Sequence, residues 1–530
     1  MSNEKGIHPY DDPEKVDTRA PDADAIVLSQ VEEEGLKRGS IGTGLFLGLG
    51  GAIATGGPLG ALLGYLIIGA LVCAVQFAVG ETSALLPITG SFVRHAEIFV
   101  DPALGFAMGW TMVYGNWLSV PGEISAICVM FAYWTDVTPV TWCLVFIFLT
   151  AVVALAPVGV FGEIEFFCAI LKILLFVGLI IFGLCTNLGG VPGVERVGFR
   201  YWKHPGPFVE NIATGAWGRF LGFWSTLISA VFSFSGMESV AMAAAETRNP
   251  RVAIPRAVKR VFARVTIFYL LSVLIVGMLV ASDDPRLQGY ADTAAQSPFV
   301  IAASKANIQA IPHIVNAVVI TSAWSSGNQA LLSGSRVLFG LAVKRQAPRI
   351  FLTTNRWGVP WVAVCTNILF SFLSFMTLSD KAINVFYWFV NLVGCGVLIS
   401  WSVILLNHLR LRMAMRRAGI SRHEMPWSNS WTPYASAFGL FFCVILLLTN
   451  GYTTFTKGNW DTSTFITAYL DIGLIIFITI VWKVLKRTKY VRISQIPLQT
   501  IFEDVHRKPL NDEPEKPSKG WIRLISWLWD

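Results

Sequence analysis

Apolar runs long enough to cross a lipid bilayer recur along almost the whole chain. A helix needs about 20 predominantly apolar residues to span the hydrocarbon, and such runs centre near residues 49, 72, 120, 149, 175, 232, 271, 327, 370, 396, 441 and 474. Of the 530 residues, 54% are hydrophobic and only 14% are charged. A soluble domain does not have this balance, so the pattern predicts an all-α integral membrane protein with about twelve transmembrane helices.

Basic residues gather in every second loop, which predicts the orientation of the chain. Loops on the cytosolic side of a membrane are enriched in Lys and Arg. The clusters are Arg248, Arg251, Arg256, Lys259 and Arg260; Lys344, Arg345 and Arg349; Arg410, Arg412, Arg416 and Arg417; and Lys483, Lys486, Arg487 and Lys489. An external loop with Arg200 and Lys203 departs from this alternation. We therefore expect a multi-pass protein with both termini in the cytosol.

Two polar tails flank the apolar region. Residues 1–38 are acidic and lack a signal-peptide core, so we expect a disordered cytosolic tail there. Residues 39–488 form the expected twelve-helix domain, and residues 489–530 a cytosolic C-terminal tail. Its end, "GWIRLISWLWD" at 520–530, is too short to span and fits an interfacial helix or a contact with a trafficking adaptor.

Several other functional classes find no support in the residues. The net charge of +7 is spread over short clusters, which argues against nucleic-acid binding. The eight cysteines occur singly, so neither a disulfide framework nor a metal site is expected. "GTGLFLGLGG" follows no strand, which argues against a dinucleotide site. Glu163 and Glu165 lie on different faces of a helix, unlike a hydrolytic carboxylate pair. We expect no enzyme activity, no metal and no cofactor.

Glycine interrupts two of the apolar runs at corresponding places. The first is "IGTG", Ile41–Gly44, and the second, five runs later, is "FSFSGME", Phe232–Glu238. Interrupted helices at matching positions in two halves are typical of transporters with an inverted repeat and a binding site near the membrane midplane. Close helix packing is the alternative, since small residues are common where membrane helices meet.

Six motifs in order resemble the fungal amino-acid permeases, a branch of the amino acid, polyamine and organocation superfamily. They are "IGTGLFLG", "GEIEFFCAILK", "GFRYWKHPGPF", "AAAETRNPRVAIPRAVKRVFARVTIFYLLSVLIVGMLV", "GSRVLFGLAVKRQAPRIF" and "LTNGY", and the match runs from Ile41 to about Glu503. The resemblance implies twelve helices in a five-plus-five inverted repeat, with helices one and six broken. It also implies a secondary active transporter of the plasma membrane that imports amino acids with protons as the coupling ion.

The interruptions offer backbone groups to a zwitterionic substrate. Amides around Gly42, Thr43 and Gly44 would bind the carboxylate, and glycine lets the ligand approach closely. The ammonium would meet carbonyls near Ser40, Ile41 and the stretch Phe234, Ser235 and Gly236, with Glu238 beside them. Phe234 would act as an aromatic gate over the substrate, although packing in the core is the competing interpretation.

Ionisable residues in the apolar runs are candidates for proton coupling, because a charge at the bilayer centre is costly and is kept for function. Lys172 lies too far along its helix to reach the interface, and the resemblance implies a role in coupling. Glu123 and Glu238 occupy places where the resemblance implies proton or ammonium partners. Glu81 lies six residues before Pro87, and we expect its side chain to extend to the cytosolic interface.

The first run is short at its cytosolic end. From Gly39 to Gly57 there are 19 residues, eight of them glycine, with Lys37 and Arg38 directly before them. At about 1.5 Å per residue they barely cross the hydrocarbon. Relatives have about ten more apolar residues here, which the resemblance assigns to the first half of helix one. We therefore expect Gly42–Gly44 near the cytosolic surface, away from Phe234, and a transport-impaired variant or the product of an altered exon boundary.

Two further functions remain open for a chain of this kind. An amino-acid sensor of the same fold would signal without net transport, but the sensors carry a longer N-terminal extension. A facilitator or exchanger of amines would be expected to lack the lysine that stands here at position 172. The expected partners are an amino-acid substrate, membrane lipid and, at the tails, trafficking or ubiquitin machinery; no nucleic acid is expected.

Overall fold

A computed structural model describes residues 44–507, except residues 45, 47, 89, 193–194, 239–250, 252–253, 256–257, 260–264, 289–296, 307, 380–381 and 457. The predicted binding residues Ser40, Ile41, Gly42 and Thr43 lie outside the described residues. So do the N-terminal tail and the expected interfacial helix at 520–530.

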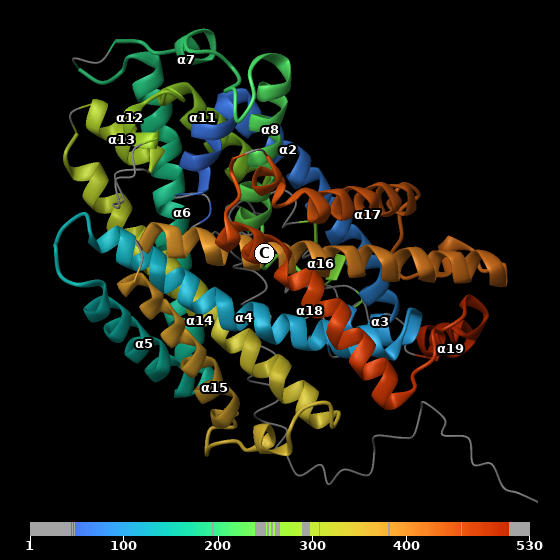
Figure 1. Ribbon diagram of the computed structural model, residues 1–530. Helices are drawn as coiled ribbons and strands as arrows, with labels where there is room; N and C mark the ends of the chain where they lie inside the picture. The colour runs from blue at the N-terminus through green and yellow to red at the C-terminus, as the bar shows by residue number, and fades with distance from the viewer. Residues whose placement is uncertain are drawn as a thin grey trace, which may run out of the picture.

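All regular secondary structure in the described part is helical (Figure 1), as the apolar runs predict. The α-helices are α2 (Gly48–Leu85), α3 (Ser91–Phe99), α4 (Pro102–Phe131), α5 (Pro139–Leu155), α6 (Val158–Leu188), α7 (Arg200–Lys203), α8 (Gly215–Ser233), α11 (Leu271–Leu279), α12 (Pro285–Gln288), α13 (Pro298–Lys305), α14 (Ala310–Val343), α15 (Trp361–Ser371), α16 (Ala382–Ala418), α17 (Thr432–Thr449), α18 (Thr462–Lys486) and α19 (Leu498–Arg507). A π-helical segment η3 (Val265–Leu270) precedes α11. The 3₁₀ segments are η5 (Arg349–Leu352), η6 (Phe372–Leu378), η7 (Arg422–Glu424), η8 (Tyr452–Phe455) and η9 (Ile493–Gln495).

The first long element, α2, consists of two helices joined at a kink. Gly57 has φ 77° and ψ 172°, which no helix contains, and Pro58 follows with no N–H to donate. The two runs centred near residues 49 and 72 therefore form separate helices on either side of Gly57. The loop after α7 packs on this kink, where the Leu59 amide donates to the Pro207 carbonyl at 3.0 Å.

Among the described residues, six helical segments are long and apolar enough to cross a membrane: α2, α6, α16, α17, α18 and the continuous segment α15–η6. Shorter apolar helices occupy Pro139–Leu155 and Phe268–Leu279. The helices α4 and α14 have 30 and 34 residues, but polar side chains interrupt their apolar faces. Length and composition thus support six spans, and the number twelve stays a prediction.

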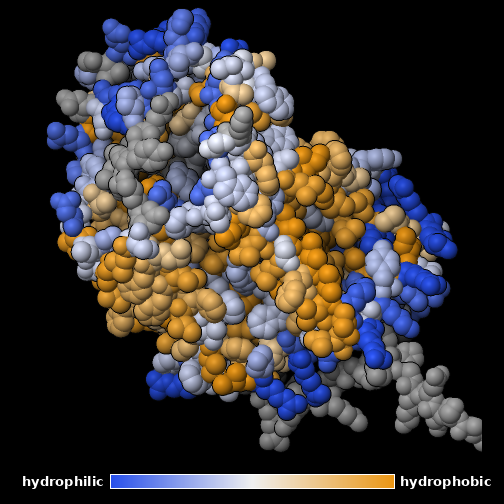
Figure 2. Space-filling view, in the orientation of Figure 1, coloured by the Kyte–Doolittle hydropathy of each residue, from blue (hydrophilic) through white to orange (hydrophobic). Residues whose placement is uncertain are grey.

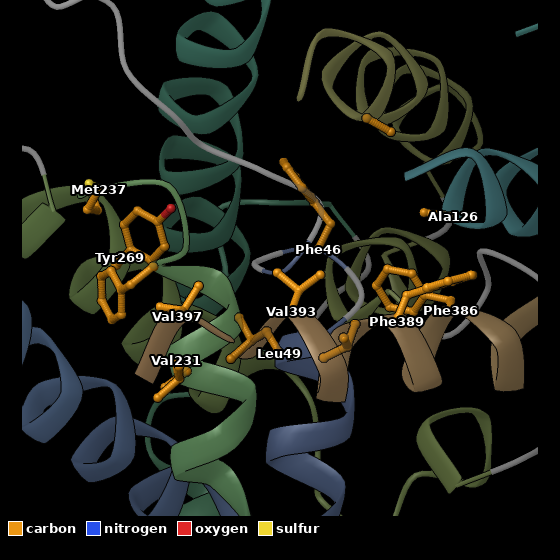
Figure 3. Packing of buried hydrophobic residues seen from close by; sticks show 14 of the residues in the cluster. Phe46, Leu49, Ala126, Val231, Met237, Tyr269, Phe386, Phe389, Val393 and Val397 are labelled. Atoms are coloured by element: carbon orange, nitrogen blue, oxygen red, sulfur yellow. The ribbon is translucent and has the colours of Figure 1, made fainter. Parts of the chain in front are cut away.

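Apolar side chains fill the interior and also cover much of the outside. The main core cluster joins the start of α2 to α16, where Phe46 and Leu49 pack near Val393 (Figure 3). Outward-facing aromatic residues such as Phe148, Phe167 and Phe438 are each more than 60% exposed. Apolar residues form a broad band between hydrophilic ends (Figure 2), which is the surface that a lipid bilayer covers.

The expectation that Glu81 extends to the interface is wrong. Its side chain is fully buried in α2, where one carboxylate oxygen lies 2.9 Å from His408 Nε2 of α16. Arg412 Nη2 lies 3.6 Å from the same oxygen, and the other oxygen accepts the Asn429 amide at 2.7 Å. A buried carboxylate is tolerated when such partners satisfy its oxygens, and these partners lie more than 300 residues along the chain.

Candidate functional site

A cavity of about 150 Å³ lies where α8 ends and the chain enters α2. The lining comes from Gly44, α4, the end of α8, α14 and α16. Among these helices, α4 packs on α14 and α16, and α8 packs on α16. The lining residues that sequence analysis had singled out are Gly44, Glu123, Ser235, Gly236 and Glu238. The structure therefore brings the second interruption, one residue of the first and both predicted coupling carboxylates to the same cavity.

The second interruption coincides with the end of α8. The helix stops at Ser233, and the amide of Phe234 still donates to the Ala230 carbonyl at 3.1 Å. Gly236 has φ +84°, a left-handed conformation that favours glycine. Residues 234–238 consequently form turns beside the cavity instead of continuing the helix. The residues that follow, from 239 to 250, lie outside the described part.

Gly44 packs directly on the end of α8. A Cβ atom on residue 44 would lie 2.8 Å from Ser233 Cα and 3.0 Å from Phe232 Cδ1, closer than atoms in contact allow. Glycine is needed here for close approach. The expectation that Gly44 would lie away from the second interruption is therefore wrong, and its placement near the cytosolic surface stays a prediction.

Glu238 is held at the cavity by two hydrogen bonds. Its Oε1 accepts the Gly236 amide at 3.3 Å, and its Oε2 accepts Trp401 Nε1 of α16 at 3.2 Å. The side chain is 9% exposed, and Trp401 is fully buried. Glu123 lines the cavity from α4, on the wall nearest Gly327. Two carboxylates thus border one small cavity, and the described lining contains no Lys, Arg or His.

Lys172 lies in a separate cluster between α6 and α14. Its ammonium donates to Ser325 Oγ at 2.8 Å, and Glu165 lies 3.8 Å away. The hydroxyl of Ser325 in turn donates to Glu165. No role was predicted for Glu165 from the sequence. Of the two glutamates at 163 and 165, Glu165 is partly buried and Glu163 is exposed. The next residue of α14, Ser326, lines the cavity, so two adjacent residues of this helix contact the lysine cluster and the cavity.

Phe234 does not line the cavity in the described part of the chain. Its ring is fully buried and stacks on Tyr269 with centroids 4.6 Å apart, and the Tyr65 ring lies tilted to it with centroids 6.1 Å apart. Both tyrosine hydroxyls bond Ser233, the last residue of α8. Phe232 lines the cavity instead. A gating role for Phe234 stays a prediction, and this packing supports the alternative of a core residue.

Sequence analysis missed most of the polar lining of the cavity. The lining follows helical spacing on three elements, and only Glu123 among these residues had been identified from the sequence: Thr111, Gly115, Ser119 and Glu123 on α4; Ser326, Gln329, Ala330 and Ser333 on α14; and Val393, Gly396, Val397 and Ser400 on α16. Residues three and four apart share one helix face. A polar or small-residue stripe within an otherwise apolar run was the signal that could have identified them.

No group of three or more potential metal ligands is found among the described residues. The cavity can offer carboxylate oxygens, amides and hydroxyls to a small zwitterion, because its wall includes Glu123, Glu238, Asn116, Gln329 and Ser119.

Comparison with known proteins places the chain among transport proteins. The model of the family described as amino acid permease matches residues 38–495. The dicarboxylic amino acid permease of Saccharomyces cerevisiae is 37% identical over 507 residues, which cover 93% of this chain and 83% of the relative. The proline-specific permease of Emericella nidulans is 37% identical over 499 residues, covering 93% and 90%.

A solved structure is similar in fold. A variant of the manganese transporter of Eremococcus coleocola superposes with a TM-score of 0.55 at 11% sequence identity, over 87% of this chain and 94% of the transporter. At that identity the likeness concerns the arrangement of helices alone.

Proposed function

The chain belongs to the amino acid permease family and is an integral, multi-pass membrane protein, and from this premise we propose that it is a secondary active transporter that imports amino acids together with protons. Its family comprises permeases and not enzymes. The observation that carries the proposal is the cavity bordered by Gly44, the end of α8, and the carboxylates Glu123 and Glu238.

The proposed architecture is twelve spans in a five-plus-five inverted repeat, with both termini cytosolic and the protein in the plasma membrane. Two helix termini support it, since α8 ends at Ser233 and α2 begins at Gly48. The contact between Gly44 and Ser233 brings these two places together. Irregular backbone inside a membrane is tolerated where it lines a cavity.

The substrate would bind across this meeting point. Backbone amides before the start of α2 would receive the carboxylate, as helix N-termini bind anions. The ammonium would bind the carbonyls of residues 234–236 and Glu238, whose oxygens are already oriented by Gly236 and Trp401. The helical stripes of α4 and α14 would then contact the amino-acid side chain.

Proton coupling would use Lys172 with Glu165 and Ser325. A lysine that hydrogen-bonds a hydroxyl and faces a carboxylate inside a membrane can exchange its proton when the pair is disturbed. Ser325 and Ser326 are neighbours on α14, so a small rotation of this helix on closure around substrate would alter both contacts at once.

Uptake of labelled amino acids by cells that lack their own permeases tests the proposal. We expect accumulation against a gradient that is greater at about pH 5 than at about pH 7, because a larger inward proton gradient drives coupled import. A sensor would bind without uptake, and an exchanger would need a counter-substrate and not a proton gradient.

The same assay tests whether the chain is a transport-impaired variant. The placement of Gly44 against Ser233 argues against impairment, and any support for it now rests on residues 40–43. Insertion of about ten apolar residues between Arg38 and Ser40 would complete a membrane-length first helix. If the insertion raises uptake sharply, the chain as given is impaired; equal uptake contradicts that alternative.

A further inference from the structure

A buried carboxylate lies behind the cavity on a helix that contributes nothing to its lining. Asp471 of α18 is 2% exposed, and its Oδ1 has no hydrogen-bond partner in the described part of the chain. The carboxylate lies against the Tyr114 hydroxyl of α4 and the backbone of Gly396 on α16. Neither the predicted substrate contacts nor the Lys172 cluster uses this residue.

Only a glycine separates Asp471 from the cavity on the side of α16. Gly396 lines the cavity, and a Cβ atom placed on it would lie 3.3 Å from Asp471 Oδ2. Tyr114 belongs to the same turn of α4 as the lining residues Met112, Gly115 and Asn116. A movement of α4 and α16 around substrate would therefore change the contacts of Asp471 with Tyr114 and with Gly396.

No basic side chain compensates this carboxylate within the described residues. The titratable groups that face it are Tyr114 from α4 and Cys395 from α16. The third element packed on α18, η8, carries Tyr452, whose hydroxyl bonds Leu221 and Ser225 instead. An ionised carboxylate enclosed without a cation is far less stable than the neutral acid, which needs only ordinary hydrogen bonds.

We propose that Asp471 is a proton-binding positioning residue behind the substrate cavity. Its carboxylate takes up one proton, COO⁻ plus H⁺ giving COOH, when α4 and α16 close around substrate, and releases that proton when water enters the opened cavity. The inference rests on the proposed function of proton-coupled import. It adds a proton-binding position on α18 that is distinct from Lys172 on α6.

Uptake kinetics between about pH 4.5 and about pH 7.5 test the proposal by comparing Asp→Asn variants at two aspartates, Asp471 within α18 and Asp461 at its N-terminus. Asn at position 471 imitates the protonated acid, so Asp471→Asn should keep the wild-type KM at the acidic end. At the alkaline end its KM should fall several-fold below that of the wild type, and its accumulation ratio should decrease because one proton is no longer carried. The control is Asp461→Asn at the exposed N-terminus of α18, where Asn can still accept the Thr464 amide.

Tyr114→Phe provides a second measurement if Asp471→Asn does not reach the membrane. Loss of the hydroxyl removes a hydrogen bond that favours the ionised carboxylate, so the midpoint of the pH profile should move to higher pH. A wild-type profile in whichever of these two variants is expressed would overturn the role of Asp471 while leaving proton coupling intact. Uptake by the wild type that does not depend on pH would instead overturn the proposed coupling, and the Asp471 inference with it.

Discussion

Gly44 and Ser233 are packed so closely that a Cβ atom on residue 44 would lie 2.8 Å from the Cα of residue 233 and 2.9 Å from its hydroxyl. These residues are far apart in the sequence, and each stands where regular helix gives way to irregular backbone. Ser233 is itself fixed by Tyr65 at 2.9 Å and by Tyr269 at 3.0 Å. The meeting of the two interruptions is therefore a rigid contact, and the cavity forms beside it.

Substitution of Gly44 by Ala should reduce uptake strongly. The added methyl group meets the Cα and the hydroxyl of Ser233 and the ring of Phe232, all within 3.0 Å. The two interruptions must therefore separate, at a cost of about 1–3 kcal/mol. We expect uptake to fall about tenfold or more, since about 1.4 kcal/mol corresponds to a factor of ten. Gly340→Ala in α14 is the matched control, because no atom of another described residue outside its own helix backbone and chain neighbours lies within 4 Å of its Cβ position. Equal uptake by both variants at equal surface expression would contradict the argument.

Removal of Lys172 should separate binding from accumulation. Lys172→Ala leaves the cavity lining intact but deletes the ammonium between Ser325 and Glu165. We expect substrate binding to persist while accumulation against a gradient is lost, and Glu165→Gln should act in the same direction. Glu163→Gln on the exposed face of α6 serves as the control. Uptake by Lys172→Ala with an unchanged dependence on pH would remove the lysine from the coupling mechanism.

Local sequence signals predicted local features well. The glycines at 44 and 236 and the carboxylates at 123 and 238 were identified from interruptions and charges within apolar runs, and the structure brings all four to one cavity. The all-helical fold followed from apolar composition in the same way. Each of these features is encoded by neighbouring residues within a single apolar run.

Features that depend on distant partners were not predictable. Glu81 looks like an interfacial residue because a proline follows it, but His408 and Arg412 of α16 enclose it. Phe234 follows the pattern of a gate, yet its environment is decided by Tyr65 and Tyr269. The position of Gly44 was mispredicted from chain length alone, because length from the membrane edge says nothing about which helix end a glycine packs on.

Trp401 should tune the substrate affinity through Glu238. Its Nε1 donates to Glu238 Oε2 at 3.2 Å, and a hydrogen bond to a charged group contributes about 1.5–3 kcal/mol. Trp401→Phe should therefore raise KM about tenfold, and Glu238→Gln should weaken both binding and accumulation. Trp224→Phe loses a comparable bond to Thr449 away from the cavity and should keep the wild-type KM. A KM that rises equally in both tryptophan variants would point to general destabilisation.

The ion pairs that Asp284 forms with Arg286 and Lys305 should persist in mild acid. Burial alone would raise the pKa of the Asp284 carboxyl, but hydrogen bonds from Arg286 and Lys305 outweigh it and hold this pKa well below its usual range. A lowered folded-state pKa gives stability that is present above the unfolded pKa of about 3.9 and is lost as the pH falls further. Asp284→Asn should thus lower the free energy of unfolding by roughly 1 kcal/mol at neutral pH, a value kept small because Arg286 is 42% exposed.

Thermal unfolding of the purified protein at about pH 7, pH 5 and pH 3 measures this difference. The melting temperatures of wild type and Asp284→Asn should differ equally at the two higher pH values and begin to converge at the lowest. Convergence already at the middle value would show that the carboxylate is not held ionised by its partners.

Labelling of single cysteines from either side of the membrane should establish the orientation of the chain. The basic clusters predict that the loop after α16 is cytosolic and that the loop before α5 is external. Met415 is unsuitable as a probe position because it is buried in a cluster with Ile496, Leu498 and Phe502. Arg417 and Asp136 are both exposed and make a matched pair.

In a background where the exposed Cys185 and Cys365 are replaced, an impermeant thiol reagent should label Asp136→Cys in intact cells and Arg417→Cys only after permeabilisation. Labelling of Arg417→Cys in intact cells would place this basic loop outside and would reverse the proposed topology.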